Sequence, residues 1–289
     1  RRSHPRPPRG SFVSDDATAA TTAAEAPPRL HVDLHDGEGP YLLLVHGMLS
    51  SRAQWMPNLE ALSQFSRPVV VELWGHGRSP TPEQMHHYTP DAYVEQFETL
   101  REDLGAERWL ICGQSMGASL TLRYVLTHPQ RAIAHVFTNS NSALAEPTSE
   151  ERMSYWQEQI TRVQEHGRVA IDDHPMNPLI NRKLSPELRE ALAADIAGMT
   201  PEGFEAMMAH TQPEAPLGHR LGENTVPSLL VVGEREERFA VLREHAERTM
   251  PHLETIGLDA NHAVNINQAE GFNIAVRDFF LRHISEQAG

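Results

Sequence analysis

The chain has 289 residues, of which 39 are acidic and 25 are basic, so its formal charge is −14. This length suits one large α/β domain or two small domains, and a hydrophobic fraction of 39% is enough to fill one sizeable core. The excess of acidic residues makes nucleic acid an unexpected partner. No apolar run approaches the roughly 18 residues that span a bilayer. A single cysteine excludes an internal disulfide and a cysteine-based zinc cluster.

The first 28 residues differ in composition from the rest. They are rich in Arg, Pro, Ala and Thr, and their apolar residues follow neither a helical nor a strand period. Such a segment cannot bury enough apolar surface to order itself, so we expect a flexible N-terminal extension over residues 1–28. A trimmed targeting or linker segment is the alternative, because arginines precede any acidic residue. A secretory signal is not supported without an apolar h-region, and we expect a cytoplasmic location.

Short apolar runs bounded by glycine, proline or polar residues predict six strands. They cover residues 41–46, 68–74, 109–113, 134–138, 228–233 and 253–258. Amphipathic segments lie between them, among them 52–65 after Ser51 and 91–104 after Thr89 and Pro90, where a capping residue and a proline begin a helix. Strands that are apolar on both faces and alternate with helices predict an α/β fold with a doubly wound, mostly parallel sheet.

The alternation of strands and helices stops between residues 143 and 225. Helical patterns follow one another there, at 150–164, 186–196 and 201–210, with no convincing strand between them. A helical insertion in a doubly wound sheet usually covers the carboxyl ends of the strands, where ligands bind. We therefore expect a helical lid, residues 143–225, inserted after the sixth strand into a core made of residues 29–142 and 226–289.

Residues 113–117 read Gly-Gln-Ser-Met-Gly and form a G-x-S-x-G pattern. A predicted strand leads into this pattern and a helical stretch, 118–126, follows it. Strand, sharp turn and helix make the geometry of a nucleophile elbow, in which the glycines let the backbone crowd and the serine stands exposed. The helix that follows directs its positive end at the site. The pattern predicts Ser115 as a nucleophile.

A serine hydroxyl becomes a strong nucleophile when a base takes its proton and a third group orients that base. In this architecture the chain order is serine, acid, histidine. His262 follows the strand at 253–258 and is the predicted base. Glu236 follows the strand-ending Gly233 and is the predicted acid. Three nearby carboxylates stay open as alternatives for the acid: Glu234, Glu237 and Asp259. The other acid position, after the strand at 134–138, holds Asn139 and Asn141, which are not carboxylates.

The oxyanion of an acyl-transfer transition state needs two backbone N–H donors. We expect them from Met116, directly after the nucleophile, and from Met48, where Gly47 lets the backbone approach the substrate. His46 and the turn at 74–79 are interpreted as structural, and Cys112 as an inert residue of a buried strand. Gln114 is a further substrate-contact candidate. Candidates for an apolar acyl pocket, each equally compatible with simple packing, are Trp55, Met153, Trp156, Met207 and Met208. The pattern calls for neither a metal nor a cofactor.

These motifs together resemble the α/β-hydrolase superfamily, from residue 30 to about residue 283. His46-Gly47, the Gly-His-Gly-Arg-Ser run at 75–79, the G-x-S-x-G pattern and Asn261-His262 follow the family's order. Glu236 stands where an aspartate is commoner.

Within the superfamily, the chain is similar to the branch of the menaquinone-pathway 2-succinyl-6-hydroxy-2,4-cyclohexadiene-1-carboxylate synthases. The similarity lies in residues 233–239, Gly-Glu-Arg-Glu-Glu-Arg-Phe, and in the lid around Glu151-Arg152 and 177–179. Gln114 and Ser119 depart from that branch, which has an aromatic residue and a carboxylate-gripping arginine in these places. Losing that arginine removes charge-assisted hydrogen bonds to a substrate with several carboxylates.

The resemblance implies a serine esterase that acts on a small-molecule ester, thioester or lactone through an acyl-enzyme. A second possibility is a cofactor-free C–O lyase or synthase that uses the same triad for proton abstraction. A third is a non-catalytic small-molecule binding protein, since this fold supports many functions. The sequence does not indicate an oligomeric state.

Overall fold

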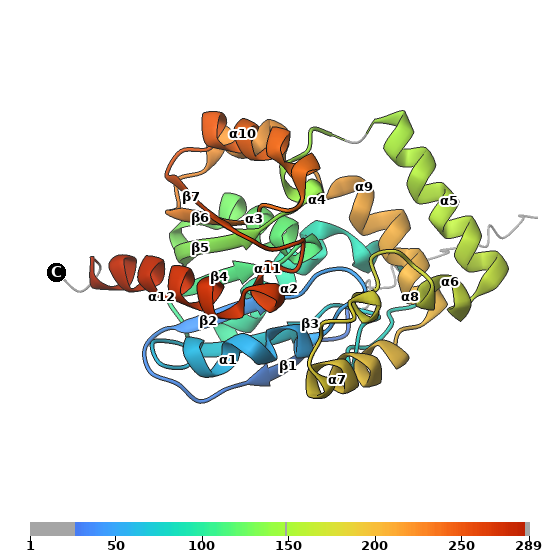
Figure 1. Cartoon of the computed structure of the whole chain (residues 1–289), viewed down its shortest axis with the longest axis horizontal. Coiled ribbons are helices and arrows are strands. Elements are labelled where there is room, and N and C mark those ends of the chain that lie inside the picture. Colours follow the sequence, from blue (N-terminus) through green and yellow to red (C-terminus); the bar gives the residue numbers. More distant parts are fainter. Residues whose placement is uncertain (1–26, 148, 287–289) are drawn as a thin grey trace, which may run out of the picture.

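A seven-stranded sheet forms the centre of the structure, a computed structural model that describes residues 27–147 and 149–286 (Figure 1). Apart from residues 27 and 28, the expected N-terminal extension lies outside the described residues. The strands run in the order β1-β3-β2-β4-β5-β6-β7 and are parallel except for β1, which pairs antiparallel with β3. Their bounds are β1 His31–Leu34, β2 Tyr41–Val45, β3 Arg67–Glu72, β4 Trp109–Gly113, β5 Ala132–Thr138, β6 Ser228–Gly233 and β7 Leu253–Leu258.

Helices cover both faces of the sheet, because successive strand residues point to opposite sides. Leu42 and Leu44 of β2 pack in one cluster with α1 (Met56–Leu62) and α12 (Ala269–Ser285). Leu43 and Val45 pack in the other cluster with α2 (Pro90–Asp103), α3 (Met116–Thr127) and α10 (Ala240–Thr249). Apolar side chains therefore face a core on both sides of the strand, as the continuous apolar runs predicted.

A helical segment, residues 139–227, connects β5 to β6. It contains α4 (Asn141–Leu144), α5 (Glu150–His166), α6 (Arg168–Asp172), η4 (Pro178–Ile180), α7 (Pro186–Ala197), α8 (Pro201–Ala206), the π-helix η5 (Met207–Thr211), α9 (Gln212–Glu214) and η6 (Gly218–Glu223). Figure 1 shows α5 to α9 beside the sheet, at the end away from α12. The segment follows the fifth strand of the chain and not the sixth, because five of the seven described strands precede it.

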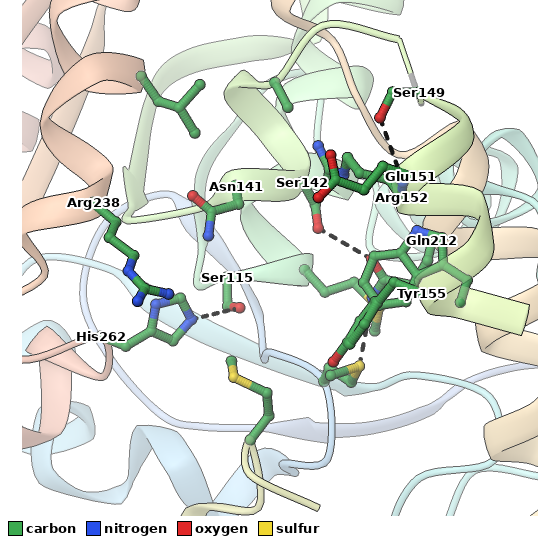
Figure 2. A pocket seen from close by; sticks show the side chains of 16 residues that line it. Ser115, Asn141, Ser142, Ser149, Glu151, Arg152, Tyr155, Gln212, Arg238 and His262 are labelled. Atoms are coloured by element: carbon green, nitrogen blue, oxygen red, sulfur yellow. Dashed lines mark hydrogen bonds between the residues drawn. The ribbon is translucent and has the colours of Figure 1, made fainter. Parts of the chain in front are cut away.

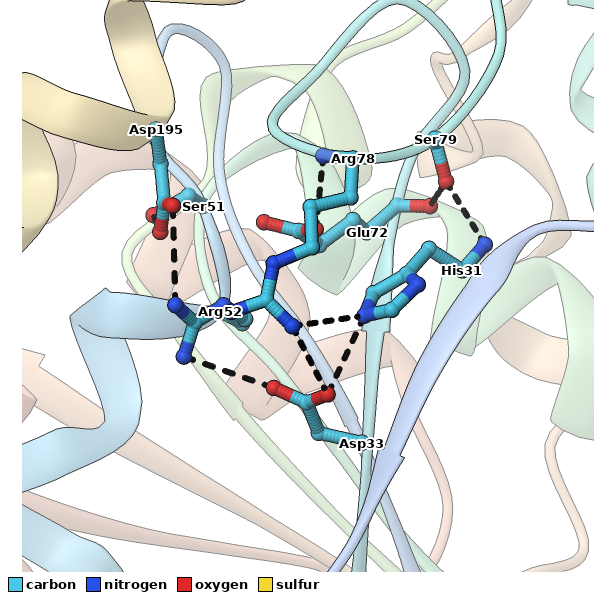
Figure 3. A network of polar contacts seen from close by, with 8 residues as sticks. All are labelled: His31, Asp33, Ser51, Arg52, Glu72, Arg78, Ser79 and Asp195. Carbon is cyan, nitrogen blue, oxygen red and sulfur yellow. Dashed lines mark hydrogen bonds and ion pairs between the residues drawn. The ribbon is translucent and has the colours of Figure 1, made fainter.

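Helix α7 is joined to the core by a polar network as well as by apolar packing (Figure 3). The Ser51 hydroxyl donates a hydrogen bond of 2.8 Å to Asp195 of α7, and Arg52 of η1 (Arg52–Trp55) lies 3.6 Å from the same carboxylate. Arg52 also lies 3.4 Å from Asp33 of β1. The Asp195 side chain is buried, so its charge is compensated by partners from the sheet domain rather than by water.

Three short elements lie around the sheet: η2 (Met85–Tyr88), η3 (Pro129–Arg131) and η7 (Glu237–Phe239), and α11 (Val264–Asn267) precedes α12. In the described part of the chain, no helix combines the length and apolar character needed to cross a bilayer.

Candidate active site

Ser115 stands on a strained turn between β4, the central strand, and α3. Its backbone angles are φ 54° and ψ −116°, a region that side-chain-bearing residues rarely occupy and that costs about 1–3 kcal/mol. A Cβ atom at Gly117 would collide with the backbone oxygens of Val45 and His46, and one at Gly113 would collide with the Thr121 side chain. Both glycines of the motif are therefore needed for the backbone to turn this closely.

Three predicted residues meet at the carboxyl end of the sheet. The Ser115 hydroxyl lies 2.7 Å from Nε2 of His262, and Nδ1 of His262 lies 2.9 Å from Oε2 of Glu236. The three side chains come from the turns after β4, β7 and β6. These turns lie close together because the carboxyl ends of parallel strands meet at one edge of the sheet. With Nδ1–H donating to the carboxylate, Nε2 is left as the acceptor for the serine proton, which is the tautomer that a general base requires.

The other candidate acids do not reach the histidine. Asp259 forms a bidentate pair with Arg235 at 2.6 and 2.7 Å, and Glu234 and Glu237 are exposed. The Asn139 side chain, which sequence reasoning set aside as a non-carboxylate, donates a hydrogen bond of 2.8 Å to Oε2 of Glu236. Burial alone would raise the pKa of Glu236, but the hydrogen bond and charge of His262 and the bond from Asn139 outweigh it and lower the pKa.

The backbone N–H groups of Met48 and Met116 are the two donors expected beside Ser115. Neither N–H donates a hydrogen bond to any described residue, and both residues line the cavity above the serine. Gly47 lies against the elbow, because a Cβ there would meet Gln114 and Ser115. His46 is structural, as expected: Nδ1 contacts the Gly47 carbonyl at 2.7 Å and Nε2 accepts from the Leu73 amide.

A cavity of about 760 Å³ opens over Ser115 and His262 (Figure 2). A second cavity, of about 330 Å³, shares these two residues. Trp156 of α5 lines the larger cavity and Gln114 the smaller one. The other expected pocket residues lie elsewhere. Trp55 packs against Phe272 under the sheet, with ring centroids 6.3 Å apart. Met153 of α5 is exposed and lines neither cavity, and Met207 and Met208 are buried in the core.

Two arginines that sequence reasoning did not assign to the pocket line the larger cavity. Arg152 comes from α5 and Arg238 from η7, and in the view of Figure 2 they lie on different sides of Ser115. Within the described ranges, neither guanidinium has a carboxylate within ion-pair distance, although the exposed Glu151 also lines the cavity. Burial lowers the pKa of Arg152. Sequence spacing does not predict that Arg152 and Arg238 line the same cavity, because the two residues lie on separate elements.

The residues that the structure describes contain no group of three histidine, cysteine, aspartate or glutamate side chains placed to hold a metal ion. Cys112 is buried in β4, and burial raises the pKa of its thiol.

A mostly parallel sheet that carries a serine on a strained turn after its central strand defines an α/β hydrolase. The family described as alpha/beta hydrolase fold matches residues 40–267, and the chain belongs to this family. The chain is 24% identical over 271 residues to a Bacillus subtilis protein provisionally named as a 2-succinyl-6-hydroxy-2,4-cyclohexadiene-1-carboxylate synthase, with 84% of this chain and 92% of that protein covered.

Two further comparisons show the range of relatives. The chain is 24% identical over 259 residues to carboxylesterase YbfK of Bacillus subtilis, covering 84% of this chain and 80% of the relative. The structure of MenH from S. aureus superposes with a TM-score of 0.76 at 16% identity, over 88% of this chain and 98% of that chain. The expected resemblance to the hydrolase superfamily is thus confirmed, and the protein is an enzyme of this fold.

Proposed function

We propose that this protein is a serine hydrolase that cleaves a carboxylic ester, thioester or lactone of a small molecule. The observation that carries the proposal is the continuous chain of contacts from Ser115 through His262 to Glu236, at 2.7 and 2.9 Å, on a strained turn. A serine in this setting is activated for attack on a carbonyl. The adjoining cavity of about 760 Å³ is large enough for a small-molecule substrate.

In the proposed mechanism, His262 takes the Ser115 proton at Nε2 as the serine oxygen bonds to the carbonyl carbon. The Met48 and Met116 amides stabilise the resulting oxyanion, and Glu236 stabilises the imidazolium. The C–O bond then breaks, and the alcohol leaves with the proton from His262. Water attacks the acyl-enzyme with His262 as base, and the carboxylic acid and free serine are regenerated.

Hydrolysis of 4-nitrophenyl acetate and butyrate tests this function. We expect Ser115→Ala and His262→Ala to lower kcat by at least about a thousandfold, because the nucleophile and its base act as one unit. The exposed Ser154 of α5 provides the matched control, and Ser154→Ala should keep the wild-type rate. Equal rates for wild type and Ser115→Ala would disprove the proposal. Labelling of Ser115 by a fluorophosphonate would in addition exclude a non-catalytic binding protein.

A second candidate function is a cofactor-free elimination, in which the Ser115–His262 pair abstracts a proton from carbon. The Arg152 and Arg238 guanidiniums favour it, because both line the cavity, neither forms an ion pair with a carboxylate of the described residues, and guanidiniums bind substrate carboxylates. The Bacillus subtilis synthase-type relative points the same way. Release of pyruvate from the menaquinone-pathway precursor, followed with a coupled assay, would support elimination. Ester turnover without pyruvate release would leave hydrolysis as the function.

We further propose that the helical segment acts as the lid expected from the sequence. This is supported by the lining of the larger cavity, to which α5 and α9 contribute Arg152, Trp156 and Gln212. The boundaries of the lid at 143–225 and of the core at 29–142 and 226–289, and the cytoplasmic location, stay predictions.

A further inference from the structure

Gln212 connects the helical segment to the two residues that frame the proposed oxyanion hole. It is the first residue of α9, directly after the π-helix η5, and its side chain is 2% exposed. Its Nε2 atom lies 3.3 Å from the Met116 sulfur and 3.6 Å from the Met48 sulfur. The Ser142 hydroxyl donates to its Oε1 at 3.1 Å (Figure 2).

The chemistry of these neighbours fixes which end of the Gln212 amide faces the methionines. Thioether sulfurs accept weak hydrogen bonds and donate none, so two N–H groups facing two sulfurs are both satisfied. The opposite orientation would place the carbonyl oxygen against two acceptors in a buried site, which is unfavourable. The amide therefore acts as a two-pronged donor that links Met48 to Met116.

This link matters more for Met48 than for Met116. The Met116 backbone is held by the first turn of α3, whereas Met48 lies in a loop after β2. That loop is closed by hydrogen bonds of 3.3 Å, from the Ser50 amide to the Gly47 carbonyl and from the Gly47 amide to Gln54. The Gly47 carbonyl also contacts Nδ1 of His46 at 2.7 Å, and because this carbonyl shares a peptide plane with the Met48 N–H, these bonds set the direction of that N–H. The Gln212 contact acts on a different quantity, the separation of Met48 from the elbow. A contact that ties the Met48 side chain to the elbow restricts this residue directly.

We propose that Gln212 is a positioning residue for the oxyanion hole: through the two sulfurs it holds the Met48 amide at a fixed separation from the Met116 amide. The proposal rests on the hydrolytic function inferred above. Oxyanion stabilisation depends on donors placed before the charge develops, and a shift of about 1 Å in such groups costs up to about a hundredfold in rate. Because Gln212 lies in the helical segment, that segment completes the hole as well as covering the cavity.

The expected consequence is a loss in kcat without a loss in substrate binding. With 4-nitrophenyl butyrate, Gln212→Leu should lower kcat about tenfold and leave KM within about twofold, because the oxyanion exists only in the transition state. An alkyl trifluoromethyl ketone inhibits such enzymes when the serine oxygen adds to its carbonyl and forms an adduct that carries an oxyanion. Its inhibition constant should rise by a similar factor. Gln212→Met, which is flexible and of similar length, gives a second variant in case Gln212→Leu does not fold.

Thr211→Val provides the matched control. Thr211 is the neighbouring buried residue, and its hydroxyl donates to the Tyr88 carbonyl instead of to the site. Its replacement should lower the melting temperature but leave kcat and the ketone inhibition constant at the wild-type values. A parallel loss of kcat in Thr211→Val would assign the effect to general loosening of the helical segment and overturn the proposal.

A double-mutant cycle tests whether Gln212 acts through the sulfurs. In a Met48→Leu/Met116→Leu background both backbone amides remain but the acceptors are gone, so Gln212→Leu should cause no further loss of kcat. An equal loss in both backgrounds would overturn the proposal, as would an unchanged kcat of Gln212→Leu in an otherwise wild-type chain. If wild type and Ser115→Ala hydrolyse the ester equally, the hydrolytic function fails as well. A Ser115-dependent wild type with an unaffected Gln212→Leu contradicts only the positioning role.

Discussion

Asn139 anchors the carboxylate that faces His262. Two hydrogen bonds to Gly233 of β6 fix the Asn139 side chain. Its Nδ2 donates to the Gly233 carbonyl at 3.1 Å, and its Oδ1 accepts from the Gly233 amide at 2.9 Å. Its remaining N–H reaches Oε2 of Glu236, the same oxygen that contacts His262. A glutamate is one methylene longer than the aspartate common at this place and has one more rotatable bond. A rigid donor from the residue directly after β5 restricts that extra freedom.

We predict that Asn139→Ala lowers kcat about tenfold with little change in KM, which corresponds to roughly 1.4 kcal/mol of lost positioning. The hydrogen bond from Asn139 lowers the pKa of Glu236, so its removal should raise that pKa and move the acidic limb of the pH–rate profile to higher pH. Profiles of kcat for ester hydrolysis measure both effects. Asn224→Ala is the control, because Asn224 is equally buried but bonds only near β6 and the Pro251 carbonyl. A profile in Asn139→Ala that matches wild type would contradict the role.

The strands and the three residues in contact at the candidate site could be predicted from the sequence, because both have local signals. All six expected strands occur with ends shifted by at most two residues. Five of them are apolar runs buried on both faces, whereas β7, at the edge of the sheet, is half-buried or exposed. Ser115, His262 and Glu236 could be placed because each follows the end of a strand. Strand β1 was missed, because its residues are half-buried or exposed at the antiparallel edge and form no apolar run.

The rest of the site depends on packing that spacing does not encode. The expected helix at 52–65 is a 3-10 turn followed by α1, because Pro57 lacks an N–H and a new helix begins around it. That arrangement turns Trp55 into the core and away from the pocket. The packing of the helical segment and of η7 on the sheet brings three further residues to the cavity: Gln212, Arg152 and Arg238. Their residue types alone are typical of any surface.

At the level of the elements, α7 should be held to the sheet domain by the Asp195 network (Figure 3). Asp195→Ala leaves the buried Ser51 hydroxyl and the Arg52 guanidinium without this partner, which costs about 1–3 kcal/mol. We expect faster amide hydrogen exchange in residues 186–197 and unchanged exchange in β4. Glu247→Ala, which removes a surface pair with Arg243 in α10, should leave the exchange of both segments unchanged. Uniformly faster exchange throughout the chain would show global destabilisation instead of release of α7.

At the level of the whole molecule, buried histidines couple stability to pH. Burial lowers the pKa of His46 and His135 to about 3 and that of His76 and His174 to about 4. In the folded protein these rings stay neutral at pH values where the unfolded chain, with a histidine pKa of about 6.5, takes up protons. Their contribution is therefore fully present above about pH 6.5 and is lost as the pH falls toward the folded pKa values.

His135 offers the clearest test of this coupling, because it is fully buried and its ring stacks on Phe137. Among the described residues, the side-chain hydrogen-bond partner of the ring is the Thr121 hydroxyl, at 3.0 Å. His135→Gln should be less stable than wild type at pH 7.5, yet lose less stability on acidification. The variant takes up one proton fewer on unfolding, so its free energy of unfolding should fall less steeply than that of wild type, by about 1.4 kcal/mol per pH unit. Between pH 6.5 and 5.0 the difference amounts to about 2 kcal/mol. Urea unfolding at these pH values measures the difference, and the −14 charge of the chain acts almost equally on both proteins. The exposed His166 supplies the control, since His166→Gln should retain the wild-type slope. If His135→Gln and wild type lose the same free energy of unfolding over this range, the ring takes up a proton in the folded state and its burial does not set the acid sensitivity.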